Sequence, residues 1–395
     1  MTAREQLAQF AAGSKALGRL CREYKNRSAT VHLEELVGGA LSFYAAAAVA
    51  ESGGVHVFVA EDRDAAAYLL NDFYNLLDER QVYFFPSSWK RSAAYGAEDA
   101  QGVVQRTATM HAVRNFSGKG YLVVCTCPEA LAERVADAEA LQRETITVRV
   151  GDRISIEVLE QALVDASFTR VDFVYEPGQY SVRGGIVDVF SYSESKPYRL
   201  DFFGDEVDRI SEINPVTGQA QRVLQHVAIY PASHYVTTKE KMDRALGQIR
   251  EELEDQVKYF NDNEMLVEAQ RIRQRTEYDM EMMRELGYCS GIENYSRIIS
   301  DRPAGSAPMT LLDFFPDDFL LFVDESHVTL PQVRAMYNGD RARKESLVRY
   351  GFRLPCAFDN RPLKFEEFES RIGQAVFVSA TPGPYERERA DNIVE

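Results

Sequence analysis

Two adjacent carboxylates, Asp324 and Glu325, follow an apolar run that is typical of a buried strand. A second apolar run leads into the turn Ser379-Ala380-Thr381-Pro382. In proteins that hydrolyse nucleoside triphosphates, an Asp at such a strand end holds magnesium, directly or through water, and a Glu polarises the attacking water. The pair therefore predicts phosphoryl chemistry, on the condition that a phosphate-binding loop accompanies it.

That phosphate-binding loop is degenerate in this sequence. The usual pattern is G-x-x-x-x-G-K-[ST], in which glycines let backbone N–H groups reach the phosphates and the Lys neutralises them. The segment 35–42 lies in the right place, between a strand and a helix, and it offers Gly38 and Ser42. However, Glu35 replaces the first glycine, Ala40 the last and Leu41 the lysine. Because Leu41 carries no charge and Glu35 repels phosphate, we expect no competent ATP site.

Without a phosphate loop, Asp324 and Glu325 have no triphosphate to act on, so we interpret them as vestigial. A divalent-cation site at the two carboxylates alone is the alternative. Our prediction is that the chain has no catalytic residues in use, no metal and no cofactor of its own.

Composition limits the partners. The chain has 395 residues and a net charge of -16, so its overall field repels nucleic acid. A DNA contact would need a local basic patch, and Arg341, Arg343 and Lys344 form the candidate. The five scattered cysteines predict free buried thiols in a reducing cytosol. The sequence shows no signal peptide and no apolar stretch long enough to span a membrane, so we expect a cytoplasmic protein without a membrane partner.

The elements that position these residues divide the chain into three parts. Residues 1–140 alternate helical and strand patterns, which favours a parallel sheet covered on both faces. Residues 145–235 read as a small antiparallel sheet with one helix, with strands expected at 145–150, 170–175, 185–191, 197–203 and 209–214. Residues 238–395 begin with a long charged helical stretch broken near Asn261 and then return to α/β texture. We expect the first and last parts to share one sheet, with the α+β module inserted between them.

Long runs of this sequence resemble known families. Residues from about 211 to 387 look like the UvrB subunit of bacterial nucleotide-excision repair, in the runs that begin at Val227 (VAIYPASHYV), Gly287 (GYCSGIENYSR), Val323 (VDESHVTLP), Met336 (MYNGDRARK), Tyr350 (YGFRLPCAFDNRP) and Val378 (VSATPGPY). Residues 1 to about 210 resemble the UvrB-homologous N-terminal module of the transcription-repair coupling factor, Mfd. The runs at His32 (HLEELVGGALS) and Phe173 (FVYEPGQYSVRGGIVDVFSYSESKPYRLDFF) and the segment 84–86 carry that second resemblance. The two meet near Phe202–Glu206, which suggests a natural or engineered hybrid.

The resemblance implies a fold and a partner. It implies a RecA-like helicase sheet: residues 1–140 form the first part of a degenerate motor domain 1a, and residues 238–395 supply a helical segment and the remainder of domains 1a and 1b. In both families the α+β module docks onto UvrA, and its contacts carry over to Arg183, Arg199 and Phe203. Arg side chains suit acidic partners, and a Phe among charged residues supplies an apolar anchor. The intact UvrB family uses ATP and magnesium, whereas the second motor domain has no counterpart in these 395 residues.

Three hypotheses follow. The first, which we favour, is a catalytically silent UvrA-binding module. The second is a UvrB-type DNA-dependent ATPase of the excinuclease, which the missing lysine disfavours. The third is a scaffold that contacts DNA weakly through Arg341, Arg343 and Lys344, which the net acidity disfavours.

Overall fold

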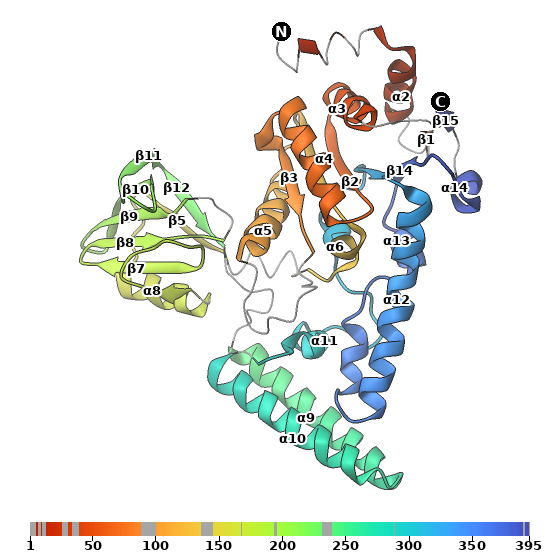
Figure 1. The fold of residues 1–395 in the computed structure, drawn as a ribbon. Coiled ribbons are helices and arrows are strands. Elements are labelled where there is room, and N and C mark those ends of the chain that lie inside the picture. Colours follow the sequence, from red (N-terminus) through yellow and green to blue (C-terminus); the bar gives the residue numbers. More distant parts are fainter. Residues whose placement is uncertain are drawn as a thin grey trace. The chain divides into compact units, whose positions relative to one another are not determined.

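The fold was analysed in a computed structural model (Figure 1). The structure describes residues 5–6, 9, 13–25, 31–33, 39–87, 100–135, 145–166, 168–192, 196–230, 239–287, 289–389 and 392–394. The chain forms two compact units, each of which is discontinuous in sequence. The first unit comprises Met1–Glu133, Thr310–Ala335 and Lys364–Glu395; the second comprises Arg134–Met309 and Met336–Leu363.

The first unit is built on a seven-stranded sheet in which every neighbouring pair is parallel. Its order is β15-β1-β14-β13-β2-β4-β3. The strands are β1 (Val31–Leu33), β2 (Gly54–Val59), β3 (Val82–Phe85), β4 (Tyr121–Thr126), β13 (Leu320–Val323), β14 (Gln374–Val378) and β15 (Asn392–Val394). Strands from both ends of the chain therefore lie in one sheet, as the sequence predicted.

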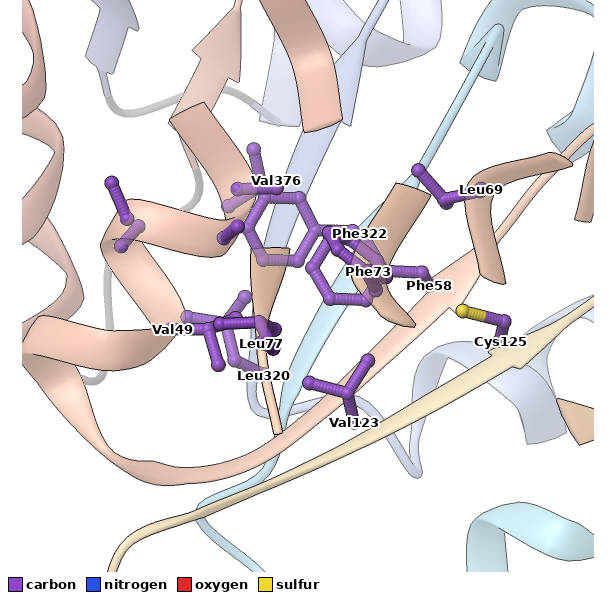
Figure 2. Close-up of a cluster of buried hydrophobic side chains, with 14 of the residues drawn as sticks. Val49, Phe58, Leu69, Phe73, Leu77, Val123, Cys125, Leu320, Phe322 and Val376 are labelled. Atoms are coloured by element: carbon purple, nitrogen blue, oxygen red, sulfur yellow. The ribbon is translucent and has the colours of Figure 1, made fainter. Parts of the chain in front are cut away.

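Both faces of this sheet are covered, which explains why its strands are continuous apolar runs rather than alternating ones. All residues of β13 and β14 are buried. On one face, Phe58 of β2 stacks on Phe322 of β13 with ring centroids 4.2 Å apart, and Phe73 packs 4.7 Å from Phe58 (Figure 2). Two helices supply much of this core, α3 (Ala40–Ser52) and α4 (Arg63–Leu76). The remaining helices of the unit are α2 (Lys15–Lys25), η1 (Glu79–Gln81), α5 (Ala100–Arg114), α6 (Pro128–Ala132), η3 (Leu311–Phe314), α13 (Phe365–Glu369) and α14 (Pro384–Arg389).

The second unit contains the α+β module. A six-stranded sheet has the order β11-β10-β9-β8-β7-β6, and β12 pairs with β5. The elements are β5 (Ile146–Arg149), α8 (Ile156–Asp165), β6 (Thr169–Arg170), β7 (Gln179–Arg183), β8 (Ile186–Val189), β9 (Tyr198–Phe203), β10 (Glu206–Ile213), β11 (Ala220–Leu224) and β12 (His226–Ile229). Helix α8 begins at Ser155, whose hydroxyl caps the N–H of Val158, and its residues Leu159 and Leu163 are buried in the core of the module.

One predicted strand of this module is wrong. The segment 170–175 is strand only at Arg170, and the sequence analysis overlooked β7, β11 and β12. The side chain of Gln179 accepts hydrogen bonds from the backbone N–H groups of Tyr175 and Glu176, so this segment closes a loop instead of pairing. Local side-chain to backbone bonds of this kind compete with a sheet ladder.

The helical part of the second unit confirms the predicted break. Helix α9 (Lys239–Asp262) and helix α10 (Leu266–Leu286) lie side by side and bury apolar residues that include Phe260 and Ile272. Between them Glu264 adopts a positive φ of 60°, which ends the first helix. Shorter helices η2 (Ile292–Tyr295), α11 (Ser296–Ile299) and η4 (Pro355–Asp359) pack nearby, and α12 (Ser326–Arg349) runs through both units.

The predicted fold class is thus confirmed: a parallel α/β sheet, a separate α+β module and a helical segment. All five cysteine side chains are buried. Among the described residues, no helix has the length and apolar character needed to cross a membrane.

Replacing Phe58 by Ala is expected to lower the free energy of unfolding by about 3 to 5 kcal/mol, because a fully packed ring leaves a cavity in the sheet core. Urea denaturation followed by circular dichroism measures the loss. The matched control is Tyr68→Ala on α4, where the side chain is 76% exposed and the expected change is within about 0.5 kcal/mol. Equal effects of the two substitutions would contradict the packing in Figure 2.

Candidate nucleotide and partner sites

The carboxylates follow β13 as predicted. The backbone N–H of Asp324 donates to Val59 of β2 over 2.8 Å, and the Asp324 carboxylate accepts from the N–H of Glu325 over 3.0 Å. Glu325 adopts a positive φ of 41°, and its carbonyl oxygen accepts from the N–H groups of Val328 and Thr329. This left-handed residue turns the chain from the strand into α12, at a conformational cost for a residue with a Cβ.

The second motif lies beside the first because β14 pairs with β13. Ser379 follows β14, and its hydroxyl is 2.9 Å from Nδ1 of His327. The same ring nitrogen is 3.4 Å from the Glu325 carboxylate. His327 therefore connects the two motifs, a role that the sequence analysis overlooked although the residue stands two positions after Glu325.

Of the degenerate loop, the structure describes only the last residues. Glu35 and Gly38 lie outside the described residues, whereas Ala40, Leu41 and Ser42 form the first turn of α3. The Ser42 hydroxyl donates to the Asp72 carboxylate of α4 over 2.5 Å. The hydroxyl that the template would offer to a metal is thus engaged within the protein.

Leu41 packs against the apolar core of the sheet. It lines a narrow enclosed space together with Asp324 and the apolar side chains Phe58, Val59, Leu69, Phe322 and Val378. No Lys or Arg in the described part of the chain pairs with Asp324 or Glu325. Burial, together with the neighbouring carboxylates Glu325 and Glu61, raises the pKa of Asp324 to about 6. None of the residues that line this space carries a positive charge.

The proposed partner contacts lie on one sheet of the α+β module. Arg183 ends β7 and Arg199 lies on β9, and β8 lies between these two strands. Both guanidinium groups converge on Asp188 of β8, which is 2% exposed. Phe203 ends β9 and is 85% exposed.

The predicted DNA patch lies within α12. Lys344 is 3% exposed and donates to the Asp340 carboxylate and to the carbonyl of Asn360. Burial lowers its pKa. Lys344 is therefore unavailable to a phosphate in this fold, and this part of the prediction is wrong. Arg341 bonds to Glu345, whereas Arg343 is 57% exposed beside Asp340.

The described residues contain no cluster of three His, Cys, Asp or Glu side chains that could hold a metal ion. The carboxylates at the end of β13 and the arginines on β7 and β9 are thus the chemical features that the fold brings together. The first is an acidic site lined by apolar side chains, and the second is a surface with two arginines that pair with Asp188.

Comparison with known proteins identifies two of the modules. Residues 146–235 match the UvrB interaction domain, and residues 240–301 match the UvrB third helical domain. The chain is similar to UvrB proteins over most of its length. The UvrABC system protein B of Caldanaerobacter subterraneus subsp. tengcongensis is 44% identical over 375 residues, which cover 91% of this chain and 56% of the relative.

Other UvrB proteins show the same relationship. The UvrABC system protein B of Staphylococcus aureus strain Mu50 is 44% identical over 358 residues, covering 88% of this chain and 54% of that protein. The protein of Enterococcus faecalis is 53% identical over 262 residues, covering 66% and 39%. The chain therefore spans about half the length of the curated UvrB relatives that it matches, or less.

The environment of Asp324 predicts a pH dependence of stability. Because its pKa is about 6 in the folded chain against an ordinary 3.8, the folded chain binds the proton more tightly than the unfolded chain. This contribution to stability is complete below pH 3.8 and is lost as the pH rises through about 6. The Asp324→Asn variant cannot ionise at this position. Its midpoint of thermal unfolding should therefore rise relative to that of the wild type between pH 3.8 and about 6, and the difference between the two midpoints should become constant above about pH 7. A difference that does not vary with pH would contradict the buried, uncompensated carboxylate.

Proposed function

We propose that this chain is a nucleotide-excision repair protein that binds UvrA through residues 145–235 and has no competent ATP site of its own. The observation that carries the proposal is the UvrB interaction domain at residues 146–235, with Phe203 standing 85% exposed at the end of β9. An exposed aromatic residue near arginines is the usual composition of an interface anchor.

The surroundings of Leu41 support the second half of the proposal. A triphosphate needs a cation at the position of the loop lysine, and here a leucine packs against apolar side chains. Ser42 bonds to Asp72 instead of facing an open site. Asp324 and Glu325 then serve the strand-to-helix turn rather than a magnesium ion.

The two family resemblances found in the sequence also bear on the ancestry of the chain. We propose that residues 1 to about 210 derive from an Mfd-like module and the remainder from UvrB. A UvrB-type ATPase and a weak DNA scaffold remain the alternatives, and the exposed Arg343 is the basic side chain that favours the latter.

Titration of UvrA by calorimetry tests the partner. Phe203→Ala is expected to weaken binding by about tenfold or more, because truncating an aromatic anchor costs on the order of 2 kcal/mol. Val216→Ala is the matched control, since Val216 is equally exposed at 85% in the same module but is not among the proposed contacts. Binding that is unchanged by Phe203→Ala would refute the proposed contact. Absence of binding by the wild type would refute the proposed partner.

An assay of ATP turnover tests the second half of the proposal, that the chain has no competent ATP site. We expect no magnesium-dependent hydrolysis, with or without DNA, because no cation of the described residues faces Asp324. The assay is phosphate release by the wild type and by Glu325→Ala. A clear rate in the wild type that disappears in the variant would show a working site and overturn this half of the proposal.

A further inference from the structure

A cluster of arginines surrounds the turn that follows α11 in the second unit. Two members come to the turn from distant parts of the sequence. Arg134 donates to the hydroxyl of Ser300 over 2.7 Å, and Arg361 donates to the carbonyl of Gly305 over 3.5 Å. The four members of this arginine cluster are Arg134, Arg297, Arg302 and Arg361.

Two carboxylates lie within the arginine cluster, and Arg297 binds both. Its Nη2 donates to Glu252 over 2.7 Å, and its Nε is 3.1 Å from the Asp359 carboxylate. The second oxygen of Glu252 accepts from the backbone N–H of Cys356, and the second oxygen of Asp359 accepts from the N–H of Gly305 over 3.0 Å. Both carboxylates are therefore occupied without Arg302.

Arg302 bonds only to neutral oxygens. Its Nη1 donates to the hydroxyl of Ser306 over 3.4 Å and to the carbonyl of Ala307 over 3.2 Å. Its Nη2 donates to the backbone carbonyl of Asp359 over 3.4 Å. These bonds are at or beyond the long end of the usual range of about 2.7–3.2 Å. The Nε of Arg302 is buried and has no hydrogen-bond partner among the described residues.

The electrostatic surroundings of Arg302 are unfavourable to its charge. The side chain is half-buried, and no described carboxylate forms an ion pair with it. Burial, together with the positive charges of Arg134, Arg361 and Arg297, lowers the pKa of Arg302 to about 10. Removing a cation from water costs free energy that a counter-charge normally offsets. The arginine cluster therefore holds one cation whose charge remains to be neutralised.

We propose that Arg302 binds a small tetrahedral oxyanion, of the phosphate or sulfate class, at the turn formed by residues 302–306. A guanidinium group binds such anions through two parallel N–H groups, so the anion would replace the long bonds of Nη1 with charge-assisted ones. Pro303, Ala304 and Gly305 are exposed, which gives the anion a path from solvent to the turn. This site is independent of the binding of UvrA.

The charge of the whole chain favours a small anion over a polymer. A net charge of -16 repels a polyanion more strongly than a single small ion. The field of the arginine cluster acts over a short distance, so it offsets this repulsion only for a ligand that enters the turn. We therefore expect inorganic phosphate to bind more tightly, per phosphate group, than a single-stranded oligonucleotide.

Calorimetric titration of the full chain with inorganic phosphate, in chloride buffer of constant ionic strength, measures the binding. The wild type should bind phosphate saturably at one site, and Arg302→Gln should weaken this binding at least about tenfold, as expected for loss of a charged hydrogen bond. Arg284→Gln is the matched control, because Arg284 is an exposed arginine of α10 in the same unit and the change in net charge is the same. The control should bind phosphate as the wild type does.

Thermal unfolding separates loss of the site from loss of the fold. Phosphate at high concentration stabilises proteins in general, so that gradual effect should be common to all three chains. The wild type and Arg284→Gln should show in addition a rise that saturates at low concentration, whereas Arg302→Gln should not. Without phosphate, Arg302→Gln should unfold at the same temperature as the wild type or higher, because the substitution removes a charge that lacks a partner.

Three results would overturn the proposal. The first is a wild type without saturable phosphate binding, and the second is equal binding by Arg302→Gln. The third is a lower unfolding midpoint of Arg302→Gln in chloride, which would show that the neutral oxygens already satisfy Arg302. An oligonucleotide that binds through Arg302 more tightly than inorganic phosphate would refute the assignment to a small anion.

Discussion

The packing of Leu41 against the parallel sheet sets the electrostatics of the whole carboxylate end of β13. An apolar side chain at this position brings Phe58 and Phe322 into the lining of the space beside Asp324. Burial removes part of the hydration of the Asp324 carboxyl, and no Lys or Arg of the described residues pairs with it. Leu41 thus lies beside the carboxyl whose pKa is raised and one residue before Ser42, whose hydroxyl donates to Asp72.

In the interaction module, by contrast, a buried carboxylate has cationic partners. Asp188 is 2% exposed whereas Asp324 is only half-buried, and two guanidinium groups reach Asp188 from the strands on either side. A buried charge with hydrogen-bonded partners is tolerated, whereas an isolated one is not. Among the described residues, Asp324 therefore has no Lys or Arg partner, whereas Asp188 has two arginine partners.

The two ends of the chain were assigned to one sheet from their apolar runs, and this worked because parallel strands buried on both faces carry a strong local signal. The strands of the α+β module were harder to predict from the sequence. Its strand β7 was overlooked because Gln179–Arg183 contains polar residues that face the opposite side from α8, and the segment before it was misread because Gln179 bonds to the backbone of the 175–176 loop. Lys344 was misassigned for a related reason: a basic residue in a basic run gives no sign that Asp340 and Asn360 bury it.

The sequence by itself determined the architecture, the kinship with UvrB and the absence of a lysine at position 41, because these depend on residue type and on local periodicity. Only the tertiary structure decided which charges are available. Arg183, Arg199 and Lys344 are all cations in the sequence, but Asp188 across the strand pair occupies Arg199, Asp340 and the carbonyl of Asn360 occupy the buried Lys344, and an edge of Arg183 stays exposed. The strand register that places Arg199 opposite Asp188 and the packing that brings Asn360 to Lys344 are properties of the fold, and residue type alone does not reveal which of the three cations stays exposed.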